Sequence, residues 1–339
     1  MKIIYDCDNT MGVPGCDIVD GLSLLYLLGK EELDICAITT TYGNSKVDIV
    51  YQNTVNMLSE IGRRDIPVYK GCTNRYGLDS EATDYLVKMV NDYPGEISIL
   101  ATGALTNLYA AYVKDQGFFR KLERLVVMGG LTQEVLPDGK AAEEWNFAVD
   151  PAAVHWVLKE GQNLSVITRD RGGRVSVAIA DFIHRLTRNR SAIGRYIVER
   201  SMLWLEYTML QLKSNSLYLG DLAAAAYLVH PQFFENQQQL ISLSTKTLSK
   251  GLLCPAENGR EGQRIHLPTL RDRDGLVEEI YRAWLKLDCG PANIIPGEAH
   301  SFLSPALLRE EKKIACTKNY PHPYRIKCGI WNESTSPVN

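Results

Sequence analysis

Short apolar runs alternate with longer helical patterns from residue 1 to residue 168, and this alternation constrains the fold most. Runs rich in aliphatic residues indicate strands, and segments of roughly 10–15 residues between them indicate helices. Repeated strand–helix units predict an α/β fold with an open, mainly parallel, Rossmann-like sheet flanked by helices. The predicted strands are 1–5, 34–41, 66–69, 97–101, 125–128 and 165–168, and the predicted helices are 21–29, 47–61, 80–91, 105–114 and 150–158.

The rest of the chain is less regular. Residues 181–217 have a mostly helical pattern, 221–228 form an alanine-rich helix, 240–253 are β-rich, and 274–287 predict a last helix. We expect one α/β domain over 1–288, with the helical middle either part of it or a cap. Residues 289–339 contain several prolines and little periodicity, so we interpret them as a C-terminal extension of uncertain order.

Composition limits the partners and the compartment. The formal net charge is −3, from 37 Lys and Arg against 40 Asp and Glu, which gives no basic surface for nucleic acid or an anionic membrane. No apolar run reaches the ~18 residues of a membrane helix, and Asp6 comes too early for a signal peptide. The eight cysteines lack CxxC or zinc-ligand spacing, which favours reduced thiols. We therefore expect a cytoplasmic protein.

Four aspartates crowd the end of the first predicted strand: Asp6, Asp8, Asp17 and Asp20. Carboxylates this close repel one another unless a cation or protons intervene. A solvated acidic loop is the plain alternative, but the strand before the loop and the helix after it are both apolar. Oxygen ligands alone favour a hard cation, Ca²⁺ or Mg²⁺, over zinc.

One short motif in this loop is similar to that of haloacid-dehalogenase-like phosphatases. In Asp6-x-Asp8-x-Thr10, the first carboxylate would attack phosphorus and the second would act as acid and base. Such an enzyme also needs a later acidic pair for Mg²⁺. Asp221 is followed by Leu and Ala residues only, so this interpretation explains one motif and no others.

From residue 1 to about 287, the chain resembles the nucleoside hydrolases, the inosine–uridine preferring nucleoside N-ribohydrolase family. Their opening motif, Asp-x-Asp-Pro-Gly-x-Asp-Asp, appears in a stretched form over residues 6–20. Several further motifs follow in the family's order, and together they are more specific than any one alone. These are Ile38-Thr-Thr-Thr-Tyr-Gly-Asn44, Ile66-Pro-Val-Tyr-Lys-Gly71, Ala101-Thr-Gly-Ala-Leu-Thr-Asn107, Val127-Met-Gly-Gly130, Glu144-Trp-Asn-Phe-Ala-Val-Asp-Pro151 and Gly220-Asp221-Leu-Ala-Ala-Ala.

The resemblance implies a hydrolase of nucleoside metabolism, active in purine or pyrimidine salvage, that releases ribose and free base with a Ca²⁺-activated water. It implies a homo-oligomer, a dimer or tetramer, with a small nucleoside as substrate. Asp8 would be the catalytic base and a Ca²⁺ ligand, with Asp20, Asp221 and the carbonyl of Thr102 as further ligands; the Thr102 side chain would matter less. The expected substrate-binding residues are Asn44, Met128, Glu144, Asn146 and Asp17.

The chain departs from the family pattern at two places. Val19 stands where a second adjacent aspartate is usual, and Asp17 could replace it if the longer loop folds back. Gly220 stands where many members carry the histidine that protonates the leaving base, and no other histidine lies in a matching motif. The base would then rely on another acid, on solvent or on aromatic stacking, with four candidates: Trp145, Trp204, Tyr207 and Tyr218.

These departures also allow a catalytically impaired homologue that binds a nucleoside or ribose. Three arginines within residues 168–174 are either a solvated basic loop or a site for an acidic substituent such as phosphate.

Structural roles compete with the ligand roles. Asp20 and Asp221 could each be a helix N-cap, and Asp150, followed by Pro151, has the pattern of a cap. Thr106 and Asn107 are also typical of a turn and cap.

Overall fold

The computed structural model describes residues 1–134, 144–188, 190–256 and 262–287, and the predicted extension 289–339 lies outside them. Its central sheet has eight strands in the order β10-β11-β6-β5-β4-β1-β2-β3. All neighbours from β11 to β3 are parallel, and only β10 is antiparallel, so the predicted sheet is confirmed. The strands are β1 (Lys2–Cys7), β2 (Asp34–Thr40), β3 (Val68–Lys70), β4 (Ile97–Ala101), β5 (Leu122–Met128), β6 (Leu164–Ile167), β10 (Gln238–Ser242) and β11 (Gly262–His266).

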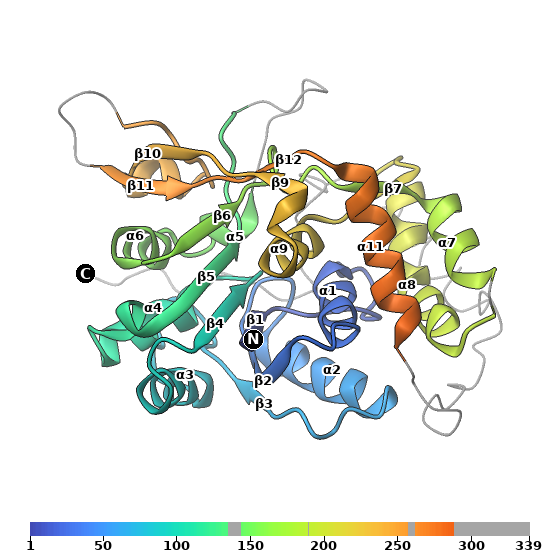
Figure 1. Cartoon of the computed structure of the whole chain (residues 1–339), viewed down its shortest axis with the longest axis horizontal. Coiled ribbons are helices and arrows are strands. Elements are labelled where there is room, and N and C mark those ends of the chain that lie inside the picture. The colour runs from blue at the N-terminus through green and yellow to red at the C-terminus, as the bar shows by residue number, and fades with distance from the viewer. Residues whose placement is uncertain (135–143, 189, 257–261, 288–339) are drawn as a thin grey trace, which may run out of the picture.

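Helices cover both faces of this sheet, each over its own hydrophobic cluster (Figure 1). One face carries α1 (Val19–Leu28), α2 (Val47–Glu60), α7 (Ile179–Thr187), α8 (Ala192–Leu210), α9 (Gly220–Val229) and α11 (Arg273–Lys286). The other carries α3 (Glu81–Asp92), α4 (Thr106–Lys114) and α6 (Pro151–Glu160). Short elements complete the fold: α5 (Trp145–Ala148), α10 (Thr245–Leu248), β7 (Ser176–Ala178), β8 (Ser216–Tyr218), β9 (Phe234–Glu235) and β12 (Thr269–Leu270).

Helix α1 is apolar on nearly every side because it lies between the sheet, α9 and α11 (Figure 1). Trp284 of α11 is fully buried, and its indole nitrogen donates to the carbonyl of Leu22 at 3.0 Å. This packing fixes the first turn of α1, and with it Asp20, against the end of the sheet.

The alternative role of helix cap does not apply to Asp20 or Asp221. Helix α1 begins at Val19, after an Asp17 carboxylate that accepts from the Val19 main chain at 2.7 Å, so Asp20 lies inside the first turn. Helix α9 begins at Gly220, so Asp221 also lies in a first turn. Both carboxylates are therefore available for other partners. The predicted cap at Asp150 is confirmed, because its side chain accepts from the main chain of Ala153 at 3.0 Å.

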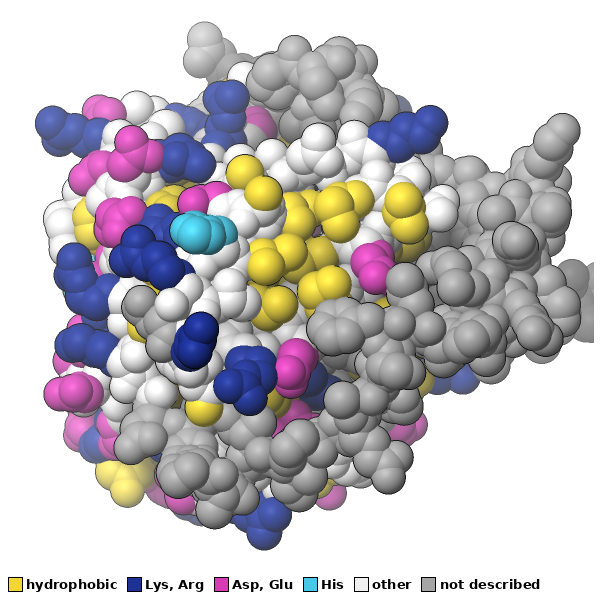
Figure 2. Space-filling model, turned by 90° about the vertical axis from the view of Figure 1, so that its right-hand side faces the viewer, with side chains coloured by type: hydrophobic (Ala, Val, Ile, Leu, Met, Phe, Trp, Pro, Cys, Tyr) yellow, Lys and Arg dark blue, Asp and Glu magenta, His cyan; other side chains and the backbone are white. Residues whose placement is uncertain are grey.

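The middle of the chain is helical as expected, in α7 and α8, and ends in β8, which pairs with β7. Figure 2 shows the side of the molecule that α7, α8 and α11 form, where hydrophobic side chains gather between charged ones. Met209 and Leu210 of α8 are among the exposed hydrophobic residues. Within the described ranges, no helix has the length and apolar character needed to cross a membrane.

The cysteine prediction is confirmed in part. The thiols that the structure shows as free are those of Cys7, Cys36, Cys72 and Cys254. Cys16, in the loop after β1, is disulfide-bonded, so the expectation of reduced thiols is wrong there.

The order in which successive strands are added to the sheet reverses at β1. Strands β2 and β3 lie on one side of it, whereas β4, β5 and β6 lie on the other. Loops leaving β1 and β4 therefore diverge at the carboxyl edge of the sheet, which is where open α/β sheets bind ligands. Asp8 follows β1 and Thr102 follows β4, so both stand at this point.

Asp6, at the centre of the sheet, has a structural role. Its Oδ2 accepts from Thr39 of β2 at 2.6 Å and from the side-chain amide of Asn107 of α4 at 2.7 Å. Asn107 is thus no helix cap, since it joins Asp6 to the main chain of Cys72. Both donors bind Asp6 into the sheet, a structural role that the phosphatase interpretation, with Asp6 as the attacking group, does not expect. Burial raises the pKa of Asp6 to about 7, against the opposing effect of its two hydrogen bonds.

We expect Asp6→Asn to flatten the pH dependence of stability between pH 4 and pH 7. Because the pKa of Asp6 rises from 3.8 to about 7 on folding, the native state binds more protons than the unfolded state in this window. The wild type therefore loses stability as the pH rises, by at most about 4 kcal/mol from this group. The amide cannot ionise, and it resembles the protonated carboxyl in shape.

Urea unfolding at several pH values, with a chelator present, measures this effect. Asp274→Asn, at an exposed carboxylate on α11, is the matched control and should follow the wild type. Parallel stability curves for the wild type and Asp6→Asn would contradict the expectation.

Candidate active site

Asp8 and Asp20 lie together at the carboxyl edge of the sheet, each about 1% exposed. Asn44, from the loop after β2, joins them. Its main-chain nitrogen donates to Asp8 Oδ2 at 2.5 Å, and its side-chain amide donates to Asp20 Oδ2 at 3.2 Å. Burial, the charge of Asp20 and a hydrogen bond between the two carboxyl groups raise the pKa of Asp8 well above its usual range. Two buried carboxyl groups in contact favour a proton or a cation between them.

Two hydroxyls hold the other oxygen of Asp20. Thr102 Oγ1 donates to Asp20 Oδ1 at 2.6 Å, and Tyr5 Oη lies 3.3 Å from the same oxygen. Tyr5 Oη also lies 3.1 Å from the Asp20 carbonyl. The side chain of Thr102 thus has a contact that the sequence did not predict. Tyr5 was missed as well, and its signal is a tyrosine inside a buried strand, whose hydroxyl needs a partner.

Glu144 and Asn146 reach the same edge from α5. The Glu144 carboxylate accepts from three main-chain nitrogens, those of Gly130 at 2.7 Å, Asn146 at 2.9 Å and Phe147 at 3.0 Å. The Asn146 amide donates to the Thr102 carbonyl at 2.8 Å and to the Met128 carbonyl at 3.2 Å. These contacts tie α5 to the ends of β4 and β5.

Asp17 and Asp221 complete the acidic group. Both are partly buried, and burial raises the pKa of each, to about 6 for Asp17 and well above the usual range for Asp221. The charges of Asp20, Asp17, Asp8 and Glu144 add to the rise at Asp221, in that order. Hydrogen bonds therefore connect Asp8, Asn44, Asp20, Thr102 and Asn146, and the pKa shifts place Asp17 and Asp221 within range of the charges of Asp8 and Asp20.

The long loop after β1 folds back to bring these carboxylates together. Thr10 Oγ1 donates to the Asp17 carbonyl at 2.8 Å. From α2, the Asn53 amide donates to the carbonyls of Asn9 at 3.2 Å and Met11 at 3.3 Å. The fold-back that Asp17 requires is therefore present, although Val19 replaces the usual second aspartate.

The oxygen atoms gathered at this edge are ligands of the type that a hard divalent cation prefers. Asp8 Oδ1 is buried and has no hydrogen-bond partner among the described residues, which is also true of Asp6 Oδ1 behind it in the chain. Asp20, Asp221 and the Thr102 carbonyl offer oxygen as well, and oxygen is the ligand of Ca²⁺ and Mg²⁺. As the side chains lie, no three His, Cys, Asp or Glu residues of the described ranges are arranged to hold an ion.

A side chain at residue 220 would require Met128 and Tyr218 to shift. A Cβ atom there would lie 2.7 Å from Met128 Cε and 2.7 Å from Tyr218 Cε1. Of the other aromatic candidates, Trp204 is buried and stacks on Tyr207 with ring centroids 5.4 Å apart, whereas Trp145 is exposed. Of these four candidates, Tyr218 is the one whose ring lies beside Gly220.

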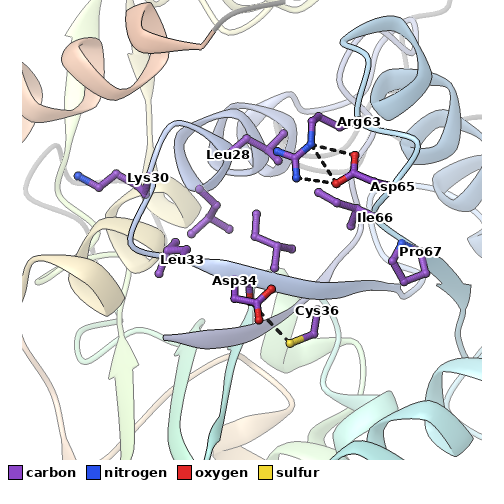
Figure 3. Close-up of a pocket in the computed structure, with 11 residues that line it drawn as sticks. Leu28, Lys30, Leu33, Asp34, Cys36, Arg63, Asp65, Ile66 and Pro67 are labelled. Atoms are coloured by element: carbon purple, nitrogen blue, oxygen red, sulfur yellow. Dashed lines mark hydrogen bonds and ion pairs between the residues drawn. The ribbon is translucent and has the colours of Figure 1, made fainter.

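A separate cavity of about 330 Å³ lies at the opposite edge of the sheet, where β2 begins (Figure 3). Three of its four charged residues, Lys30, Arg63 and Asp65, have charged partners. Arg63 pairs with Asp65 at 2.9 Å, and Lys30 pairs with Glu279 at 2.6 Å. The cavity contains none of the site residues that the sequence predicts.

Known proteins resemble this chain in sequence and in fold. A probable uridine nucleosidase 2 from Oryza sativa subsp. japonica is 24% identical over 281 residues, covering 74% of this chain and 80% of that protein. A pyrimidine-specific ribonucleoside hydrolase RihA from Citrobacter koseri is 26% identical, covering 73% and 85%. Among solved structures, a plant nucleoside hydrolase, PpNRh1, has a TM-score of 0.74 at 25% identity, covering 84% of this chain and 98% of that one.

The family model described as inosine-uridine preferring nucleoside hydrolase matches residues 3–275. That range includes every site residue described above and ends inside α11. The chain therefore belongs to the inosine–uridine preferring nucleoside hydrolase family and is a hydrolase of the nucleoside N-ribohydrolase class.

Proposed function

We propose that this protein cleaves ribonucleosides to ribose and free base, with Asp8 accepting a proton from the attacking water and Ca²⁺ as the resident ion. One observation carries the proposal most: the buried pair of Asp8 and Asp20, in which Asp8 Oδ1 has no partner within the described residues. A buried carboxylate with a free oxygen has the form that a general base needs.

The acidic group suits the charge that the reaction develops. Breaking an N-glycosidic bond builds positive charge on the ribose ring in an oxocarbenium-like transition state. The charge of Asp20 raises the pKa values of Asp8 and Asp221, and Asp8 adds to the rise at Asp221, so acidic groups are concentrated at this edge. The field of such groups stabilises a cationic transition state more than a neutral substrate.

The ion would be held by Asp8, Asp20, Asp221 and the carbonyl of Thr102. When bound, it would lower the pKa of a water and orient the hydroxyls of the sugar. The Thr102 and Tyr5 hydroxyls and the Asn44 amide keep Asp20 in place from three directions. The oxygen donors suit Ca²⁺ and Mg²⁺ alike, and Ca²⁺ is proposed on the family resemblance.

The ribose would be held by the polar groups around this pair. Asn146 and Glu144 are fixed by main-chain contacts on both sides, so their positions are set before a substrate arrives. We propose that Asn44 and Asp17 add contacts to the sugar and that Met128 lines its pocket. Buried polar groups of this kind reject a sugar that lacks the matching hydroxyl.

Three broader features belong to the same proposal. The family resemblance supports a homo-oligomer. The cytoplasm is supported by the four free thiols, whereas the disulfide-bonded Cys16 is unusual for that compartment. The family match over residues 3–275 and the two-faced packing of the sheet support a single α/β domain over 1–288.

Asp8→Asn is expected to reduce kcat/KM for uridine or inosine about 10²–10⁴-fold, because the amide cannot accept the proton. Release of free ribose measures the reaction. Asp274→Asn, remote and exposed, is the matched control. A wild type that binds nucleosides without releasing ribose would support the impaired homologue instead.

Millimolar Ca²⁺ is expected to raise the Tm of the wild type by several degrees over protein kept in a chelator, since a ligand that binds only the folded state stabilises it. Asp8→Asn and Asp221→Asn should lose most of this shift, whereas Asp274→Asn should keep it. Thermal unfolding needs no substrate and therefore tests the ion separately from activity. An equal shift in all four proteins would place the ion elsewhere.

The wild type should prefer uridine to 2′-deoxyuridine about 10–100-fold in kcat/KM, because a polar group left without its hydroxyl costs about 1–3 kcal/mol. Asn146→Ala should narrow that ratio toward one. The ratio does not depend on how much of the variant is folded. A ratio unchanged from the wild type would remove Asn146 from sugar recognition.

A further inference from the structure

The long loop after β1 is held from outside by side chains of two helices. Asn53 of α2 lies against its first turn, where the side-chain amide donates to the carbonyls of Asn9 at 3.2 Å and Met11 at 3.3 Å. The next residue, Gly12, has a φ of +91°, a backbone conformation that favours glycine. The loop therefore turns sharply at the place where Asn53 binds it.

Arg200 of α8 joins the same contact from the other side. Its Nη2 donates to Asn53 Oδ1 at 3.3 Å. Its guanidinium lies over Gly12, since a Cβ atom there would be 2.8 Å from Arg200 Cζ. Glu60 also ties α2 to α8, because its Oε2 lies 3.7 Å from Arg200 Nε and accepts from Tyr196 Oη at 2.8 Å. The turn of the loop is thus enclosed between α2 and α8.

An asparagine suits the position between Arg200 and the loop because its two ends differ. A guanidinium can only donate hydrogen bonds, and a main-chain carbonyl can only accept them. The side chain between them must therefore accept on one side and donate on the other. The Asn53 amide does both, so its contact with Arg200 also fixes which end faces the loop.

The turn that these two residues hold is connected to Asp17. Thr10 lies between the two residues whose carbonyls Asn53 contacts, and it is fully buried. Its hydroxyl donates to the Asp17 carbonyl at 2.8 Å. The Asp17 carboxylate in turn accepts from the main chain of Val19 at the start of α1, at 2.7 Å. A displacement of the turn would therefore be passed to the main chain of Asp17.

We propose that Asn53 and Arg200 are positioning residues, which hold the long loop after β1 in the fold-back that brings Asp17 to the sugar side of the site. This inference rests on the proposed function, in which Asp17 contacts the ribose. Both residues act through the main chain of the loop rather than on the substrate. Helix α8, from the helical middle of the chain, thereby contributes to the geometry of the site.

Hydrogen exchange tests this positioning without a substrate. The main-chain nitrogen of Met11 donates to Asn9 Oδ1 at 3.0 Å, and that of Val13 donates to the Thr10 carbonyl at 2.8 Å. Amides exchange faster where a segment opens locally, so these two amides report on the turn. Cys16 is disulfide-bonded farther along the loop, and all proteins are therefore compared in the same redox state.

We expect Asn53→Ala to speed exchange at both amides about tenfold or more, because two hydrogen bonds to the loop are lost. Asn53→Asp should do the same, since a carboxylate still pairs with Arg200 but cannot donate to the loop. Gln52→Ala, at the exposed neighbouring position of α2, is the matched control and should exchange as the wild type does.

Arg200→Gln should speed exchange at the same amides about threefold, because the Asn53 amide loses the partner that orients it. Arg195→Gln is its matched control, at an exposed arginine of the same helix. Exchange in β4 should be equal in the wild type and all variants. That comparison separates an effect on the loop from a general loss of stability.

Kinetics with uridine test whether the loop acts through Asp17. Asn53→Ala should raise KM about tenfold and leave kcat within about threefold, since a contact to the sugar is present in substrate and transition state alike. Asp17→Asn should raise KM to a similar degree. The double variant should be no worse than either single variant, because both changes remove the same contact.

Unchanged exchange at the turn in Asn53→Ala would overturn the proposal. Effects on KM that multiply in the double variant would overturn it too, because Asn53 would then act independently of Asp17. An equal rise of exchange in β4 would show that Asn53 supports the whole fold, which also contradicts the proposal. A wild type that releases no ribose would refute the proposed function, while the exchange rates would still decide whether Asn53 and Arg200 hold the loop.

Discussion

Two carboxyl groups buried side by side at the end of the central strand are the constraint around which the molecule is arranged. The side chains of Asp8 and Asp20 are both buried, and burying either one in its ionised form costs free energy. The surrounding donors reduce that cost: the Asn44 main chain and amide, and the hydroxyls of Thr102 and Tyr5. These donors come from β1, β4 and the loop after β2, so three adjacent strands must end together for the pair to exist.

The same constraint explains the close packing around Asp8. Gly43 and Gly103 approach its carboxylate from both sides, and a Cβ atom at Gly43 would overlap Asp8 Oδ2. Beneath the pair, Asp6 bridges β1, β2 and α4 through Thr39 and Asn107. The sheet edge is thus held by polar contacts that extend inward from the site, which keeps the site geometry fixed before any ligand binds.

The sequence predicted the strands, the main helices and the parallel sheet, because those depend on local periodicity. The candidate site residues were predicted from a series of motifs in the order of the family. Helix starts were harder, since an aspartate just before an apolar run looks like a cap, and Asp20 and Asp221 proved to lie inside their helices. Contacts between distant residues could not be predicted. Thr102 reaches Asp20 across 82 residues, and Asn107 reaches Asp6 across 101, which only the strand order decides.

Gly220 changes what the leaving-group side of the site can do. An imidazole can give a proton near neutral pH, whereas glycine has no side chain that could do so. Met128 and Tyr218 occupy the space that a side chain at residue 220 would enter, since a Cβ atom there would lie 2.7 Å from Met128 Cε and from Tyr218 Cε1. A histidine at this position would therefore require both side chains to move. Under the proposed function, the proton for the departing base has to come from another acid or from solvent.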